Sequence, residues 1–422
     1  MYCLSWSLPP AHKLSIYREP TYGRFVFRSI FLYKVRLNAI VVITALLTAA
    51  SAGYCLLCIW AAIRFRSGAN ISSPPATDLP PVSILKPLKG TDPEMYESFR
   101  SHCVQDYGKY EIVFGISNEE DPAAVLVEQL IRDFPELSIR LVRCEKKLGV
   151  NGKVSSLAQL ASAAKYDFML VNDSDIRVSR DYLRTVISDL QQANVGLVTC
   201  LYRGVAHRTT GSRLESLGIS TDFAAGVLAA NTLEGGLHFG LGSTLAFRQQ
   251  ELEAIGGFEA IADYLADDYE LGKRISQLGL KVALSRSVVE TFLPAYGFSG
   301  FLSHQLRWAR TIRASRPAGY AGLVLTYTLP WAILSVVLAH GAAWTWSVFV
   351  VALALRFVMA ALVGVSVLGD HNLPRLLWLL PLRDLLAPFI WLGGLFGRKI
   401  VWRGEKFELR EGKLKRVAAS GA

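Results

Sequence analysis

Charged side chains follow three short apolar runs of the sequence. The run at 82–85 is followed by KPLKG, the run at 111–117 by NEED, and the run at 166–171 by NDSD. If these runs are parallel strands, their carboxyl ends meet at the sheet edge where ligands bind. Carboxylates there, together with substrate phosphates, favour Mg²⁺ or Mn²⁺, with Asp173 and Asp175 as the metal ligands. The alternative is a simple strand-exit turn, since such turns are also rich in Asp, Ser and Asn.

Two further motifs lie later in the chain. Asp267 and Asp268 open a helical pattern after a Gly-Gly turn, where carboxylates also stabilise the first helical turn. The stretch 298–313 is basic and amphipathic and contains the pair Arg307 and Trp308. Its alternative interpretation is an interfacial helix that Arg and Trp anchor at a membrane surface.

The elements that would position these motifs alternate between strands and helices. Alternation of this kind predicts an α/β fold with a mainly parallel, Rossmann-like sheet. The predicted strands are 82–85, 111–117, 139–142 and 166–171, and the predicted helices are 93–105, 122–134 and 154–164.

The composition points to a membrane protein. Of 422 residues, 51% are hydrophobic and only 19% are charged, whereas soluble proteins carry about 25% charged residues. The net charge of +10 fits nucleic acid, an anionic membrane or a phosphate-bearing substrate, and does not choose among them. Six cysteines are too few for a disulfide scaffold in so long a chain, and their spacing predicts no zinc site.

An uncharged apolar run precedes the predicted α/β domain. Residues 38–63 contain no Asp, Glu, Lys or Arg, and a helix of about 20 residues crosses the hydrocarbon layer. A cleaved signal peptide is the alternative, which the long leader before the apolar run disfavours. We therefore expect an amino-terminal transmembrane anchor at 38–63.

Three more apolar regions follow the domain. We predict spans at 321–339 and 344–365, with a turn at His340-Gly341 and with Arg356 facing protein, a carboxylate or water, because an intramembrane Arg is costly. The region 376–396 is broken by charged residues and prolines, and is predicted as a kinked span or a pair of interfacial helices.

These segments predict four units along the chain. They are an anchor at 38–63, a cytoplasmic domain at 81–316, membrane segments at 317–397 and a basic cytoplasmic tail at 398–422. The density of Lys and Arg in the tail favours the cytoplasmic side. Domain and tail then share one side, so we expect two full spans plus an interfacial or re-entrant segment between them.

Taken in order, the motifs resemble those of one enzyme family. Asp121, Asp173 to Asp175, Asp267-Asp268 and Arg307-Trp308 resemble the pattern of inverting GT-A glycosyltransferases of family two and their ceramide glucosyltransferase relatives, including the bacterial hopanoid-biosynthesis glycosyltransferase. The stretches PVSILKP, NGKV, NDSDIRV and LADDYELG support the resemblance, which covers about residues 38–410. One position departs from the pattern, because His304 stands where the family usually has Gln or Arg.

The resemblance implies a UDP-sugar donor, a lipid acceptor, and Mg²⁺ or Mn²⁺ as cofactor. Asp268 would be the general base of a single displacement that inverts the anomeric carbon. Asp121 would hold the uracil or ribose, and Lys153 and Arg307 the phosphates. The implied donor-binding residues are Lys86, Asp121, Lys153, Asp173, Arg307 and Trp308; the implied acceptor-side residues are His238, Asp267 and His304; the implied metal ligands are Asp173 and Asp175.

Several functions stay open at this stage. The favoured one is ceramide glucosyltransferase-like transfer of glucose or N-acetylglucosamine; the alternatives are a hopanoid (bacteriohopanetetrol) N-acetylglucosaminyltransferase, a processive polysaccharide synthase, and a non-enzymatic receptor or transporter. A synthase would need more spans and usually Gln at position 304. The run 149–154 lacks the Ser or Thr of a nucleotide-binding phosphate loop. We expect no nucleic acid partner, and a multi-pass protein of a bacterial inner membrane.

Overall fold

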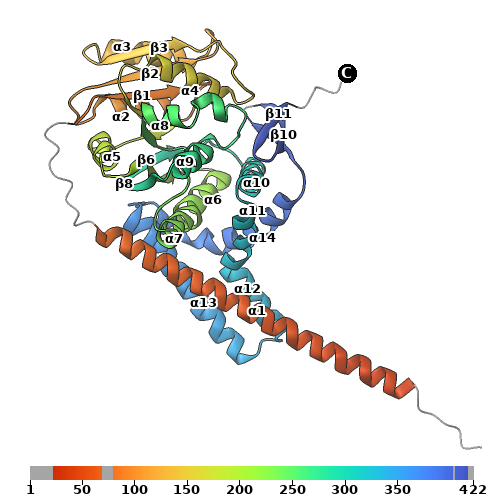
Figure 1. Ribbon diagram of the computed structural model, residues 1–422. Coiled ribbons are helices and arrows are strands. Elements are labelled where there is room, and N and C mark those ends of the chain that lie inside the picture. Colours follow the sequence, from red (N-terminus) through yellow and green to blue (C-terminus); the bar gives the residue numbers. More distant parts are fainter. Residues whose placement is uncertain (1–21, 69–78, 403, 417–422) are drawn as a thin grey trace, which may run out of the picture.

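A sheet domain stands on a bundle of long apolar helices (Figure 1). The computed structural model describes residues 22–68, 79–402 and 404–416, and describes side chains from residue 38 onward. Helix α1 (Tyr22–Ser67) runs past the end of the bundle, and the helices that follow the sheet domain in sequence pack along it.

The domain is built on an eight-stranded sheet with the strand order β3-β2-β1-β4-β7-β6-β8-β5. The pairs β1–β2, β1–β4, β2–β3 and β6–β8 are parallel, while β7 is antiparallel to both of its neighbours. This confirms the predicted α/β fold with a mainly parallel sheet. The strands are β1 (Val82–Pro87), β2 (Tyr110–Ile116), β3 (Ser138–Arg143), β4 (Phe168–Val171), β5 (Ile176–Arg177), β6 (Val195–Val205), β7 (Leu245–Arg248) and β8 (Lys281–Phe292).

Helices cover both faces of the sheet, which is why β1 is buried along its whole length. Alternate side chains of this strand enter two different cores, Ile84 on one face and Leu85 on the other. The helices of the domain are α2 (Met95–Cys103), α3 (Ala123–Asp133), α4 (Gly152–Ala163), α5 (Tyr182–Leu190), α6 (Thr210–Gly218), α7 (Ala224–Leu233), α8 (Gln249–Ala254), α9 (Asp267–Gln277) and α10 (Phe298–Ser315), with a π-helical turn η2 (Ile219–Phe223) and a 3₁₀ turn η3 (Phe258–Ile261).

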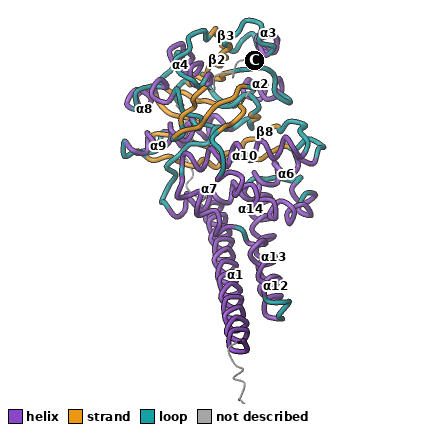
Figure 2. The backbone as a smooth tube through the Cα atoms, turned by 90° about the vertical axis from the view of Figure 1, so that its right-hand side faces the viewer, coloured by secondary structure: helices purple, strands orange, loops and turns teal. Residues whose placement is uncertain are grey.

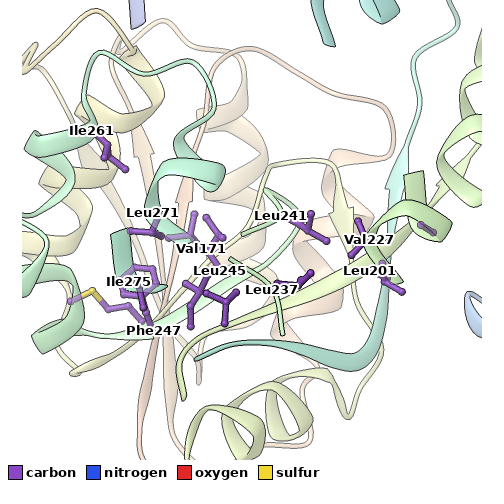
Figure 3. Packing of buried hydrophobic residues seen from close by; sticks show 14 of the residues in the cluster. Val171, Leu201, Val227, Leu237, Leu241, Leu245, Phe247, Ile261, Leu271 and Ile275 are labelled. Carbon is purple, nitrogen blue, oxygen red and sulfur yellow. The ribbon is translucent and has the colours of Figure 1, made fainter. Parts of the chain in front are cut away.

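The Leu85 core continues from the sheet into the helical bundle. Figure 3 shows Val171, Leu245 and Leu271 packed near the sheet, with Leu241 and Val227 leading toward α7. The same cluster includes buried side chains of the bundle, namely Cys55, Cys58, Ala61, Ala62, Met359 and Val363. Sheet domain and bundle therefore share one hydrophobic core.

Among the residues that the structure describes, three helices are long and apolar enough to cross a membrane: Asn38–Ser67, Ala343–Val367 and Leu377–Leu395. A further pair, Pro317–Thr326 and Thr328–Leu338, passes the same test jointly but is bent by 52°. The elements are α11 (Pro317–Gly322), η4 (Leu323–Thr326), α12 (Thr328–Leu338), α13 (Ala343–Ala361), η5 (Leu362–Val367), η6 (Leu373–Arg375), η7 (Leu377–Leu379) and α14 (Leu380–Leu395).

The predicted turn between the first two carboxyl-terminal spans is present. His340 and Gly341 connect α12 to α13, and both have positive φ, a backbone conformation that Gly adopts without strain. The prediction for Arg356 is also confirmed, because this buried side chain pairs with Asp222 at 2.6 Å and with Asp384 at 2.8 Å.

Helix α14 differs from α12 and α13 in its placement. Figures 1 and 2 show α14 beside α10 at the base of the sheet domain, while α12 and α13 extend away from the domain. Its buried Arg383 and Asp384 face protein, and it is one helix that contains Pro388 rather than a pair of short helices. Its exposed side chains are apolar and recur at helical spacing: Leu382, Leu385, Phe389, Leu392 and Leu395.

Residues that the sequence presents as a basic tail form a folded sheet. Strands β9 (Lys399–Trp402), β10 (Glu405–Arg410) and β11 (Lys413–Arg416) pair antiparallel. Apolar side chains alternate with the basic ones, and Phe407, Leu409 and Leu414 are buried against Leu265. The sheet is also hydrogen-bonded to the domain, from Leu265 N to Gly412 O at 3.1 Å and from Leu414 N to Asp263 O at 2.7 Å.

Candidate functional site

A single large cavity joins the carboxyl edge of the sheet to the helical bundle. It has a volume of about 2360 Å³. At one end it is lined by Asp173, Asp175 and Asp268, and at the other by Gly53 and Leu57 of α1. Strands β9 and β10 supply part of its wall. One end of the cavity is thus acidic and the other is apolar.

Lys153 links two of the motifs found in the sequence. Its Nζ lies 2.8 Å from Asp173 Oδ1 and 3.0 Å from Asp267 Oδ2. Asn151 caps the start of α4 by accepting from Val154 N and donates to Tyr264 O at 2.7 Å, which fixes the first helical turn that carries Lys153. Burial opposes the charge of this lysine, but Asp173 and Asp267 raise its pKa well above the usual value.

Asp268 stands opposite this lysine, at the start of α9. Its Oδ2 accepts from Gly242 N at 2.8 Å and its Oδ1 from Tyr269 N at 2.8 Å. Burial, and then the neighbouring charge of Asp267, raise the pKa of Asp268 to about 6. A carboxylate whose pKa lies this close to neutrality suits proton transfer.

Asp173 and Asp175 diverge slightly after β4. Asp173 reaches Lys153, while Asp175 accepts a short hydrogen bond from the Thr291 hydroxyl at the end of β8. Burial and the charge of Asp173 raise the pKa of Asp175 to about 6. The negative charge at this edge is thus only partly compensated by protein groups.

The residues at this edge fit a divalent cation that shares its coordination with the substrate. An ideal Cβ on Gly242 would lie 3.2 Å from Asp173 Oδ2 and 3.3 Å from Asp268 Oδ2, so the missing side chain leaves a space between two carboxylates. No cluster of three or more acidic, His or Cys side chains able to hold a metal occurs among the residues described. Phosphate oxygens would have to complete the shell, as is common for Mg²⁺.

Aromatic rings form the middle of the cavity wall. Tyr202 of β6 contacts Phe223 with ring centroids 5.0 Å apart, and Phe223 contacts Trp308 at 6.2 Å. Trp308 in turn lies 5.1 Å from His304. Arg307 lines the same wall, so α10 presents the Arg-Trp pair to the cavity.

His304 has a buried partner that the sequence does not reveal. Its Nδ1 lies 2.5 Å from Oε1 of Glu215, a side chain of α6 with no exposed surface. Both residues line the cavity. The departure from the usual motif at position 304 is thus accompanied by an acidic residue that can pair with imidazole.

Three predicted residues lie outside the described lining of this cavity. Lys86 is fully buried and donates to the carbonyl oxygen of Asp173 at 3.2 Å, and burial lowers its pKa to about 7. Asp121 accepts from Gly90 N at 3.0 Å and fixes the loop after β1. His238 is exposed and hydrogen-bonds Ser276 at 2.7 Å.

The structure brings four further residues to the site: Tyr202, Glu215, Gly242 and Thr291. Gly242 lies in the run GLGST, where glycines permit close backbone approach. Tyr202, Glu215 and Thr291 carry no local signal, because they come from long strands and a helix far away in sequence.

Comparisons with known proteins agree with this geometry. The family model described as glycosyl transferase family 21 matches residues 41–415. Ceramide glucosyltransferase 3 of Caenorhabditis elegans is 25% identical over 352 residues, which cover 80% of this chain and 74% of that protein. Ceramide glucosyltransferase 1 of the same organism is 27% identical over 358 residues, which cover 80% and 73%.

A solved structure supports the fold independently. A mannosyltransferase from Pyrobaculum calidifontis, solved in complex with GDP-Man and Mn²⁺, covers 85% of this chain and 97% of its own, with a TM-score of 0.51 and 21% identity. The sheet is therefore a GT-A sheet, and the chain is a glycosyltransferase. Since the family match extends over the sheet domain, the bundle and strands β9 to β11, the chain belongs to glycosyl transferase family 21.

Proposed function

We propose that the protein transfers a hexose, glucose or N-acetylglucosamine, from a UDP-sugar to a hydroxyl group of a membrane lipid, with inversion at the anomeric carbon. The observation that carries this proposal is the continuity of the cavity. Its acidic end suits a nucleotide diphosphate with a divalent cation, and its other end is lined by apolar helices. The ceramide glucosyltransferases among its relatives are named for transfer to a lipid.

The donor would occupy the acidic end. Mg²⁺ or Mn²⁺, held by Asp173 and Asp175, would neutralise the charge of the departing diphosphate. Lys153, already charged between Asp173 and Asp267, and Arg307 would contact the phosphates. Asp121 and Lys86 would act indirectly, by holding the loops after β1 and β4 in place.

Asp268 would act as the general base. Its carboxylate would take the proton of the acceptor hydroxyl while that oxygen attacks the anomeric carbon and the bond to the diphosphate breaks. The hydrogen bonds from Gly242 N and Tyr269 N would hold the carboxylate in one orientation. A single displacement from an α-linked donor gives a β-glycoside.

The acceptor would reach the site from the bundle. Gly53, Tyr54 and Leu57 of α1 and Gly226 and Leu233 of α7 line the apolar end of the cavity. The three candidate spans support an integral membrane protein, with units at 38–63, 81–316 and 317–397. We further propose that the sheet domain lies on the cytoplasmic side, because of the basic residues that follow Gly397.

The proposal is tested by transfer assays on membranes that contain the full chain. Labelled UDP-glucose and UDP-N-acetylglucosamine are offered with ceramide, bacteriohopanetetrol or diacylglycerol, with and without Mn²⁺. We expect one pair to give a labelled lipid, and Asp268→Asn to lower turnover about 10²–10⁴-fold while donor binding is retained. Label that enters only long polymer, or no lipid at all, would contradict the proposal.

A further inference from the structure

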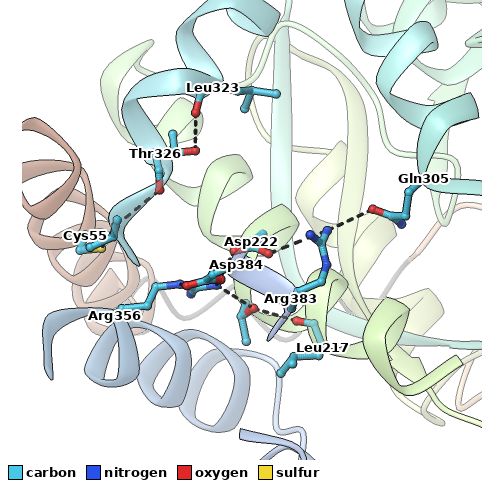
Figure 4. Close-up of polar contacts among 11 residues, drawn as sticks. Cys55, Leu217, Asp222, Gln305, Leu323, Thr326, Arg356, Arg383 and Asp384 are labelled. Carbon is cyan, nitrogen blue, oxygen red and sulfur yellow. Dashed lines mark hydrogen bonds and ion pairs between the residues drawn. The ribbon is translucent and has the colours of Figure 1, made fainter. Parts of the chain in front are cut away.

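A polar cluster lies within the cavity, away from the carboxylates of the sheet edge. We call it the Asp222 cluster, and its members are Asp222, Arg356, Arg383, Asp384 and Gln305 (Figure 4). Asp222 precedes Phe223, whose ring contacts Trp308 in the aromatic wall. The cluster thus lies between that wall and the helices of the bundle, where a lipid headgroup would have to pass.

The ion pair at the centre of the cluster is complete without Asp222. Asp384 accepts from Arg356 at 2.9 Å through one oxygen and at 2.8 Å through the other. Arg383 donates to Gln305 at 3.0 Å. Asp222 adds a second carboxylate at 2.6 Å from Arg356. Arg356 does not need this second carboxylate to balance its charge, because Asp384 already does so.

Asp222 is also the member that reaches the open cavity. Its side chain is 38% exposed, against 3% for Arg356, 8% for Asp384 and 10% for Arg383. It is carried by the π-helical turn η2, an element that is frequent at functional sites. Its second oxygen lies 4.0 Å from Arg383, beyond hydrogen-bonding distance.

The cluster is not saturated by protein groups. Nη1 of Arg356 and Nε of Arg383 are buried and have no hydrogen-bond partner among the described residues. Both side chains line the cavity, and both residues are more than nine-tenths buried. Both guanidinium groups therefore depend on the carboxylates of Asp222 and Asp384 for their ion pairs, which holds Asp222 in place at the cavity.

The charge of the cluster selects the kind of ligand. The formal charges of the two arginines and two aspartates sum to zero. The cluster therefore favours an uncharged lipid headgroup over a phosphate. The accessible group is a carboxylate, which accepts hydrogen bonds from O–H or N–H donors. The complementary lipid is neutral and carries a second such donor next to its reacting hydroxyl.

We infer that Asp222, whose charge Arg356 and Arg383 together balance after Asp384 is counted, binds the second hydrogen-bond donor of a neutral lipid acceptor and so selects that acceptor. This inference rests on the proposed function. Ceramide, with an amide N–H and a second hydroxyl, and a polyol such as bacteriohopanetetrol both carry the donor. Diacylglycerol has only the reacting hydroxyl.

The test compares two variants that each remove one carboxylate from Arg356. Asp222→Ala should raise KM for the preferred lipid at least tenfold, leave KM for the UDP-sugar unchanged, and reduce the preference over diacylglycerol. Asp384→Ala, the matched control, should lower the thermal unfolding temperature and keep that preference. If Asp222→Ala is poorly folded, Asp222→Asn replaces it, with a smaller shift in the same direction. Wild-type preference in a folded Asp222 variant would overturn the inference.

A measurement without transfer separates this inference from the proposed function. Ceramide and bacteriohopanetetrol that carry a diazirine beside the headgroup are crosslinked to the full chain in detergent micelles, without nucleotide sugar. Labelling of the peptide that contains η2, lost in Asp222→Ala, supports the inference even if no lipid is glycosylated. Labelling that is the same in both proteins, or absent from this peptide, overturns it.

Discussion

Gly242 illustrates how a residue without a side chain can organise the site. Its N–H binds Asp268, and its missing Cβ leaves room between Asp173 and Asp268. Gly242→Ala should therefore place a methyl group against both carboxylates and lower kcat/KM by about tenfold to a hundredfold. The variant's Mn²⁺ dependence should shift to higher concentration while its unfolding temperature changes little. Full activity at wild-type Mn²⁺ concentrations would show that the space is not used.

His304 and Glu215 offer a second comparison at this scale. Glu215 has no exposed side-chain surface and pairs with His304 at 2.5 Å. His304→Gln restores the usual motif and can still donate to Glu215, so activity should be largely retained. His304→Leu removes the imidazole partner of the buried carboxylate, and should lower the free energy of unfolding by about 1–3 kcal/mol. Chemical denaturation of the two variants checks this, and equal stability would contradict it.

The functional residues differ in whether a local sequence motif allows them to be predicted. Asp173 and Asp268 stand in dense local motifs at element ends, Arg307 stands beside Trp308 in an amphipathic helix, and the structure brings all three to one cavity. Tyr202 and Glu215 lie in the interior of β6 and α6, where only the packing of distant elements reveals which side chains face the site.

Secondary-structure elements were likewise predicted only where the local sequence pattern is clear. The strands at 82–85, 111–117, 139–142 and 166–171 were predicted within about two residues of β1 to β4, because short apolar runs alternate there with helical patterns. The second half of the sheet was not predicted. Strand β7 is short and antiparallel, and β6 and β8 mix polar with apolar residues along a pair that contains register shifts, so no clear periodicity marks them.

The small sheet β9 to β11 supports the start of α9, which carries Asp267 and Asp268. Leu265, two residues before Asp267, is hydrogen-bonded to Gly412 and packed against Leu414. Leu414→Ala removes a side chain that is only 2% exposed, a change that typically costs about 2–5 kcal/mol. We expect faster hydrogen exchange in 263–269 and reduced turnover, both measured on the full chain. The exposed Lys415→Ala is the matched control and should change neither.

The packing of the α/β domain against the small sheet β9 to β11 limits how the chain can be threaded through a membrane. The α/β domain and the sheet β9 to β11 are packed together, so both lie on the same side of a membrane and the chain between them crosses it an even number of times. We propose that the hairpin of α12 and α13 provides two crossings, with α12 continued by the bent segment before it. Helix α14 also passes the length and composition test for a span, but because its apolar stripe faces outward and Arg383 and Asp384 face inward, we propose that it lies along the surface.

Cysteine accessibility tests this arrangement. In a background with Cys3 and Cys103 changed to Ser, Glu94→Cys and Glu411→Cys should react with an impermeant maleimide from the same side of sealed vesicles. His340→Cys, in the turn between α12 and α13, should react only from the opposite side. Reaction of Glu411→Cys together with His340→Cys would mean an odd number of crossings and would contradict the packing.

The position of β9 to β11 in the chain has a consequence for biogenesis. Strands β9 and β10 form part of the cavity wall, and the small sheet packs against Leu265, just before Asp267. These strands are nevertheless translated after every helix of the bundle. A nascent chain therefore holds the Asp173 edge and the Arg307-Trp308 pair long before the cavity is closed. On the proposed function, we expect catalytic competence only after the helices of the bundle have been synthesised, so the order of synthesis would delay consumption of the sugar donor until the bundle is in place.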